Sequence, residues 1–215
     1  MKKLLFWMVL ICSVAVILTS CSKDEESTTA ASTSVTSTTA SGSITVGSET
    51  LSGTYVSECN TTQFAAAAGS NFFPLDVKSG KTVIVVTSDT TFSDEMLMYT
   101  DTSCSTPTAY TKNGNTSVTV GAPSGNYYLV TYKELTTKIK PSTDVAKSHM
   151  DTFASSTGQS LTFTVGSETS VTDSGSTKYN LVSVTSTTIQ TGNSSDNATP
   201  TSLDDGSLSM TKACQ

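Results

Sequence analysis

The chain has 215 residues, a formal net charge of -6, and 36% hydrophobic and 14% charged residues, and more than a third of its positions are serine or threonine. All 12 basic residues are lysine and His149 is the single histidine, which excludes bidentate arginine contacts to phosphate or guanine and multi-histidine metal sites. We expect one domain with no metal, no cofactor and no nucleic-acid partner, because an acidic chain repels a phosphate backbone.

The N-terminus has the pattern of a secretory signal. Two lysines precede an apolar run from Leu4 to Leu18, in which Ser13 is the one polar residue, and small residues follow it. The run is shorter than the about 20 residues that span a bilayer, so residues 1–20 are predicted to be a cleaved signal peptide. The segment from Leu18 to Cys21 (LTSC) resembles the lipobox of bacterial lipoproteins. This resemblance implies that Cys21 carries diacylglycerol and an acyl chain such as palmitate, which anchor the protein to the bilayer without spanning it.

The residues after Cys21 bear on the location of the protein. Ser22, rather than aspartate, follows the cysteine, which by resemblance to enterobacterial sorting implies the outer membrane. The segment from Lys23 to Glu26 (KDEE) resembles the tag that exports lipoproteins to the cell surface in Bacteroidota; a solvated charge run is the alternative. We expect a protein that is lipid-anchored in the outer membrane of a Gram-negative bacterium and exposed on the cell surface or facing the periplasm.

A tether is expected to follow. From Ser27 to Ser43 the chain is almost wholly serine, threonine, alanine and glycine. Such a segment buries too little apolar surface to offset the entropy of ordering, so it is predicted to be flexible. The expected organisation is a signal peptide at 1–20, a lipidated tether at 21–45 and a folded domain at 46–215.

The folded part consists of short segments rich in valine, tyrosine, threonine and isoleucine, separated by turn residues. Such segments predict an all-β barrel or sandwich. Asn113-Gly114 is typical of a type I′ hairpin turn, and Asp94 and Glu95 point to opposite faces if they lie in a strand. The predicted strands are Ile44–Val46, Leu51–Cys59, Thr82–Thr87, Glu95–Thr100, Ala109–Lys112, Ser117–Val120, Tyr127–Ile139, Leu161–Val165, Tyr179–Ser186 and Ser207–Ala213.

One segment has helical periodicity instead. After Pro141, apolar residues recur at three- and four-residue spacing, Asp144 lies near the positive end of the helix dipole, and Gly158 can end the helix. We expect one short amphipathic helix at about 142–157 that lies on the barrel or across its mouth.

Two motifs carry a family resemblance. The segments from Gly53 to Cys59 (GTYVSEC) and from Tyr99 to Pro107 (YTDTSCSTP) resemble a pattern of lipocalin-like bacterial lipoproteins, with a similar pairing in the adenomatosis-polyposis-coli-down-regulated domain. Tyr55 departs from the pattern, since tryptophan is commoner there. The resemblance implies an antiparallel, lipocalin-like (calycin-type) β-barrel, and the size of the domain suits about eight to ten strands.

Three cysteines remain after cleavage of the signal and lipidation of Cys21. They are Cys59, Cys104 and Cys214, and an oxidising compartment predicts one disulfide among them. The resemblance implies a Cys59–Cys104 bridge. Cys59–Cys214 is the alternative, because closing a barrel brings its first and last strands together.

The expected function is non-enzymatic binding of a small apolar or amphipathic ligand inside the barrel of a monomer. The alternative is a structural or adhesive surface module whose barrel is filled by its own side chains. A hydrolase is not expected, because His149 has no nucleophile elbow, and Asp144 and Asp151 do not face its imidazole on a shared helix. The candidate ligand-binding residues are Phe73, Tyr110, Tyr127, Tyr128 and Tyr132, for which packing in the core or rim is the alternative.

Overall fold

The structure, a computed structural model, describes residues 36–172, 175–192, 195–196, 199–203 and 207–213. The predicted signal peptide, Cys21, the segment from Lys23 to Glu26 and Cys214 lie outside these residues. The described elements are β1 (Ile44–Val46), β2 (Glu49–Leu51), β3 (Thr54–Ser57), α2 (Thr62–Ala67), β4 (Ser79–Val86), β5 (Phe92–Tyr99), β6 (Pro107–Ser124), β7 (Tyr127–Pro141), α3 (Asp144–Ser156), β8 (Thr169–Thr172), β9 (Thr177–Val184), β10 (Thr188–Thr191) and β11 (Leu208–Lys212).

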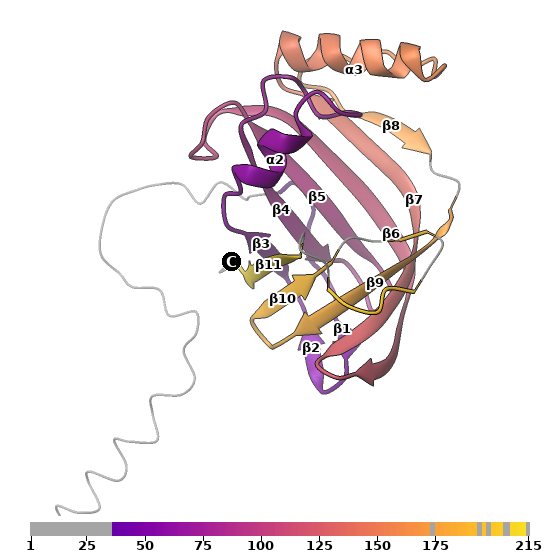
Figure 1. Ribbon diagram of the computed structural model, residues 1–215. Coiled ribbons are helices and arrows are strands. Elements are labelled where there is room, and N and C mark those ends of the chain that lie inside the picture. Colours follow the sequence, from indigo (N-terminus) through magenta and orange to yellow (C-terminus); the bar gives the residue numbers. More distant parts are fainter. Residues whose placement is uncertain (1–35, 173–174, 193–194, 197–198, 204–206, 214–215) are drawn as a thin grey trace, which may run out of the picture. The chain divides into compact units, whose positions relative to one another are not determined.

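The strands form a closed antiparallel barrel (Figure 1). Eight strands follow one another in the order β6-β5-β4-β3-β11-β10-β9-β7, and β7 pairs back with β6 to close the ring. β8 is an additional strand on the later part of β7. The predicted all-β, antiparallel barrel is therefore confirmed, and its shape is calycin-like.

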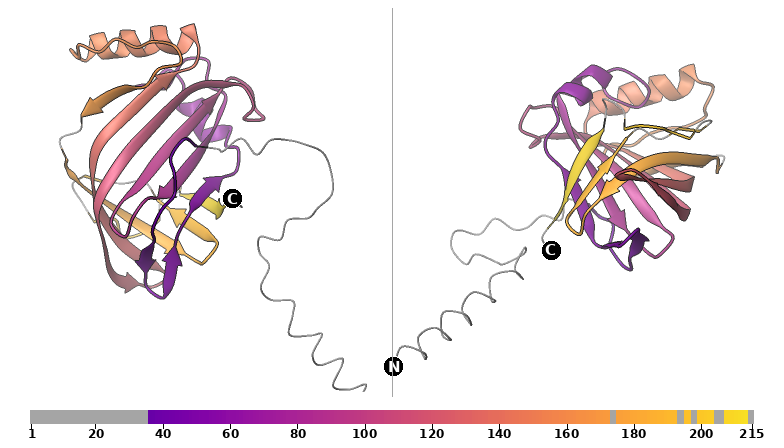
Figure 2. Two further views of the ribbon diagram at one scale, coloured as in Figure 1. Left: turned by 180° about the vertical axis from the view of Figure 1, so that it is seen from behind. Right: turned by 60° about the horizontal axis from the view of Figure 1, so that its bottom comes forward.

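The hairpin of β1 and β2 pairs only with itself among the described strands. It lies at one end of the barrel and α3 lies at the other, as Figures 1 and 2 show from several sides. The two ends of the barrel are thus covered by different elements.

The helix predicted at 142–157 is confirmed as α3. The Thr143 hydroxyl caps its first turn by accepting a 3.1 Å hydrogen bond from the backbone N–H of Ala146. Ala146, Met150 and Ala154 are fully buried, so this face of the helix packs on the barrel. Neither described helix is long and apolar enough to cross a membrane.

The hairpin predicted at Asn113-Gly114 is wrong. Both residues lie inside β6, which pairs with β5 on one side and with β7 on the other. Because both neighbouring strands hold the backbone extended, the turn comes later, at Gly125, where φ is +62°. β6 and β7 are long strands, and the register of their pairing shifts at three points along them.

The strand predicted at Leu161–Val165 is also wrong, because this segment is irregular. Its apolar character comes from packing on α3: Phe163 is fully buried, and its backbone N–H donates to Asp151 Oδ1 at 3.0 Å. The short helix α2 and the strands β8 and β10 had no separate prediction.

The last part of the predicted tether lies along the barrel. Ser41 donates its backbone N–H to the Val86 carbonyl at 3.0 Å, and the Thr38 hydroxyl donates to Glu95 Oε1. Residues 36–43 therefore differ from the flexible segment that their composition predicts, because the barrel supplies hydrogen-bond partners for them.

A disulfide joins Cys59 to Cys104, with a Cα–Cα distance of 5.9 Å. This is the pair that the family resemblance implies. It ties the end of β3 to the loop between β5 and β6. In that loop, Asp101 accepts hydrogen bonds from Thr106, Ser103 and Ser105, which hold the pKa of its carboxyl well below the ordinary value.

Candidate functional site

The interior of the barrel holds two separate hydrophobic clusters. We call the one beside the β1–β2 hairpin the hairpin cluster and the one beneath α3 the helix cluster. The hairpin cluster consists of Ile44, Val46, Leu51, Tyr55, Val86, Val118, Val130, Val182, Ile189 and Met210. The helix cluster consists of Phe64, Val77, Met98, Ala109, Ile139, Ala146, Met150, Ala154 and Phe163.

A band of polar side chains lies between the two clusters. On β5, Phe92 packs against the hairpin cluster and Met96 against the helix cluster, with Asp94 between them on the same face of the strand. Neighbouring strands repeat this order. We call Asp94, Asn113, Asn115, Glu134, Thr137 and Lys178 the polar layer.

Hydrogen bonds join the polar layer into a network. Asn113 Nδ2 donates to Asp94 Oδ2 at 2.9 Å, and Asn115 Nδ2 donates to Asp94 Oδ1. The Thr137 hydroxyl donates to Asn113 Oδ1 at 2.9 Å. The network thereby links β5, β6 and β7, which orients the Asp94 carboxylate.

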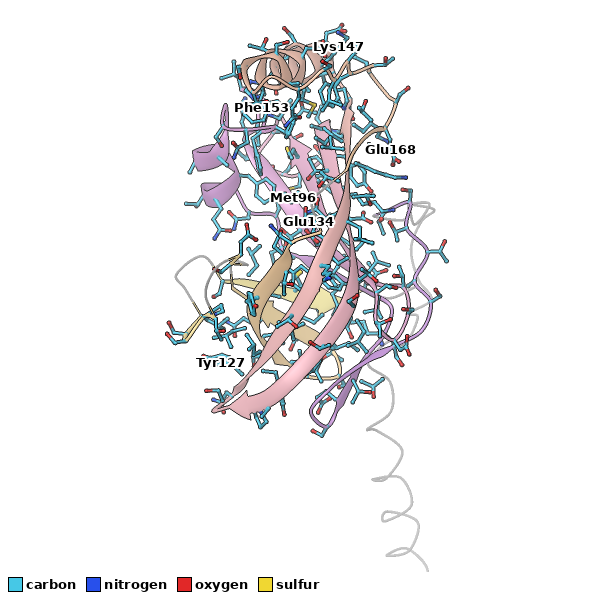
Figure 3. All side chains as sticks on the ribbon, turned by 90° about the vertical axis from the view of Figure 1, so that its right-hand side faces the viewer. Met96, Tyr127, Glu134, Lys147, Phe153 and Glu168 are labelled. Atoms are coloured by element: carbon cyan, nitrogen blue, oxygen red, sulfur yellow. A yellow bond between two sulfur atoms is a disulfide. The ribbon has the colours of Figure 1, made fainter. Side chains whose placement is uncertain are left out.

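The layer continues through an ion-pair chain. Lys178 Nζ lies 2.7 Å from Asp196 Oδ1 and 3.8 Å from Glu134 Oε2. Figure 3 shows Glu134 and Met96 at mid-height of the barrel, between the end with Phe153 on α3 and the end with Tyr127. Charged groups therefore reach the middle of the interior and are not confined to its mouths.

The environment of Asp94 changes its acidity. Burial raises its pKa from 3.8 to about 6, and the negative charge of Glu134 acts in the same direction. The amides of Asn113 and Asn115 oppose this rise by hydrogen bonding to the ionised form. The carboxylate is surrounded by protein, although part of its surface borders a cavity.

That cavity has a volume of about 360 Å³ and lies inside the barrel. Its walls are mostly apolar and come largely from the hairpin cluster, and Ile44, Val46 and Leu51 of the β1–β2 hairpin form one side. Asp94, Asn113 and Asn180 supply polar groups to the same cavity. The site is therefore amphipathic, with apolar walls and a polar region around Asp94.

The five aromatic residues predicted to bind a ligand do not lie together. Tyr132 lines the cavity, and Tyr128 packs against the hairpin cluster beside it. Tyr110 borders a separate hollow on the outer face of the barrel, and Tyr127 begins β7 at the turn from β6. Phe73 packs near the helix cluster, with its ring centroid 6.0 Å from that of Phe64.

The polar residues of the site had only a weak signal in the sequence. Asp94 and Glu95 were expected on opposite faces, and the structure places Asp94 inward and Glu95 outward, where Thr38 covers it. Asn113 was not expected to point into the barrel, because its Asn-Gly pair is typical of a turn. The inward alternation of Phe92, Asp94 and Met96 was the one signal that pointed to a polar group inside.

The structure also shows the surroundings of His149. Its Nε2 lies 3.0 Å from the backbone carbonyl of Asn71, so this nitrogen is used in a contact between α3 and a loop. Among the described residues, no group of three or more histidine, cysteine, aspartate or glutamate side chains is arranged to hold a metal ion.

No protein-family model matches the chain, and no curated protein has a matching sequence.

Proposed function

We propose that this protein is a non-enzymatic lipoprotein of the cell envelope that binds a small apolar or amphipathic molecule inside its barrel. The cavity of about 360 Å³ carries the proposal. Its volume falls within the range of roughly 300–1,000 Å³ that is usual for small-molecule sites, and mostly apolar walls with a few placed polar groups are typical of such sites.

The pattern at the N-terminus supports the anchor. A basic start, an apolar run and the LTSC segment ending at Cys21 are all in the order that lipidation requires. Lipid on Cys21 would tether the barrel to the outer membrane, on the periplasmic or the cell-surface side, and the bilayer would be its partner through that lipid.

The alternative, a structural or adhesive module, was expected to have a barrel filled by its own side chains. The cavity favours ligand binding over that alternative, because a protein interior without a binding role is normally packed to near crystal density.

Binding of an environment-sensitive fluorescent apolar probe tests the proposal. Val182→Phe places extra volume in the cavity wall, so we expect the affinity for the probe to fall by about tenfold or more. Val145→Phe is the matched control, because Val145 is 51% exposed on α3. Circular dichroism verifies that both variants are folded.

Equal probe affinity in Val182→Phe and the wild type would contradict binding inside the barrel. A second test is native mass spectrometry of protein purified from its own cells. A barrel that is always empty there, and that also binds no probe, would contradict ligand carriage altogether.

A further inference from the structure

The charges around the cavity are unbalanced. The polar layer and its neighbour Asp196 contain three carboxylates, on Asp94, Glu134 and Asp196, but one ammonium group, on Lys178. Lys178 is already engaged, at 2.7 Å from Asp196 and 3.8 Å from Glu134. None of the ion pairs formed by the described residues includes Asp94.

Asp94 is also the one acidic or basic side chain among the described residues that line the cavity. Its two oxygens each accept one amide N–H, from Asn113 and from Asn115. A carboxylate has about four acceptor positions, so capacity for further donors remains. The carboxylate is thus held at the cavity wall by neutral partners that leave its negative charge uncompensated.

A second polar side chain lines the same cavity. Asn180 is one of the lining residues, and its Nδ2 donates to the Gly192 carbonyl at 3.0 Å. Its Oδ1 is enclosed by protein and has no hydrogen-bond partner among the described residues. Asn180 therefore adds a neutral polar group, but no compensating charge, to the cavity wall.

The head group of the ligand follows from this carboxylate. A carboxylate or phosphate head would be repelled by Asp94 and Glu134, whereas an ammonium group would supply both the missing positive charge and further hydrogen-bond donors for Asp94. We infer that the ligand of this cavity is a cationic amphiphile, whose ammonium head binds the Asp94 carboxylate while its apolar body packs against the hairpin cluster. This inference rests on the proposed function of ligand binding.

Three probes with the same alkyl chain test the inference: octylamine, octanol and octanoate, each titrated into the full folded protein at neutral pH by calorimetry. We expect octylamine to bind about tenfold or more tightly than octanol, since hydrogen bonds to a charged group are the stronger ones, and octanoate to bind most weakly. Asp94→Asn should weaken octylamine binding by about tenfold and leave octanol binding nearly unchanged.

Asp89→Asn is the matched control, because Asp89 is exposed in the turn between β4 and β5 and its replacement removes the same charge. Octanol binding shows that the Asp94 variant is folded. Equal affinities for octylamine and octanol, or unchanged octylamine binding in Asp94→Asn, would overturn the inference and leave the proposed function standing. Failure of all three probes to bind would overturn the proposed function together with the inference.

Discussion

Asp94 and Asn113 face each other across the β5–β6 pair, and Asn113 Nδ2 donates a 2.9 Å hydrogen bond to Asp94 Oδ2. The bond places a carboxylate at the wall of a mostly apolar cavity. A buried charge costs free energy unless it is compensated, so this pair decides both the pH response of the barrel and the chemistry of its cavity.

Asp94 should make the stability of the barrel depend on pH. Its pKa is about 6 in the folded protein against 3.8 when unfolded, so its protonated form favours folding. That contribution is complete below about pH 4 and is lost as the pH rises through about 6. The loss is on the order of 2–3 kcal/mol. The charged groups nearest to Asp94 in the polar layer are Glu134 on β7 and Lys178 on β9.

The comparison with Asp94→Asn isolates this effect, because asparagine does not titrate. As the pH rises from about 4 to about 7, the wild type should lose this contribution and the variant should not. The free energy of unfolding of the variant, measured by urea denaturation, should therefore rise by that amount relative to the wild type. Asp89→Asn should show no such trend. A parallel pH dependence of Asp94→Asn and the wild type would contradict the assignment.

Gly47 should be required for docking of the β1–β2 hairpin. A Cβ at this position would lie 2.0 Å from Tyr128 Oη, and φ is +63°. Gly125 has almost the same φ, +62°, but a Cβ there would meet no atom within 4 Å. Gly125→Ala should therefore cost about 1–2 kcal/mol for its backbone alone, and Gly47→Ala about 1–3 kcal/mol more for the clash.

Thermal or urea unfolding of the two variants measures this difference. Gly47→Ala should also weaken binding of an apolar probe, since the hairpin contributes Ile44, Val46 and Leu51 to the cavity wall. Equal destabilisation by both substitutions would mean that Tyr128 does not restrain the hairpin.

The Cys59–Cys104 bridge should stabilise the fold by restricting the unfolded chain. It closes a loop with a sequence separation of 45 residues, for which the chain-entropy model gives about 4 kcal/mol. The double replacement of both cysteines by alanine should lower the free energy of unfolding by a comparable amount, whereas Cys214→Ala should have little effect. Peptide mapping without reductant identifies the pair directly, and a bridge that contains Cys214 would contradict it.

Cys21 should be required for membrane attachment. In a bacterial host that processes lipoproteins, the wild type should incorporate labelled palmitate and partition into the detergent phase, and Cys21→Ala should do neither. Cys12→Ala is the matched control, because Cys12 lies within the apolar run that we expect to be removed with the signal. Unlabelled wild-type protein in the aqueous phase would indicate an ordinary secretory signal.

Local patterns in the sequence were sufficient where one element decides its own structure. α3 has Asp144 in its first turn, an apolar stripe and a glycine after its end, and all three signals lie within the helix or next to it. Asn113-Gly114 shows where this reasoning fails. The dipeptide favours a turn in isolation, but pairing with β5 and β7 on both sides keeps it extended.

By itself, the sequence determined the all-β class and the amphipathic helix, because each depends on residue types and spacings within short stretches. The signal and lipobox pattern is of the same local kind and stays a prediction. The tertiary structure alone decided that Asp94, Asn113, Glu134 and Lys178 share one layer inside the barrel. These residues come from β5, β6, β7 and β9, and they meet only because the register of each pair and the closure of β6 on β7 bring distant parts of the chain to the same height. The cavity and its polar region are long-range properties of that closure.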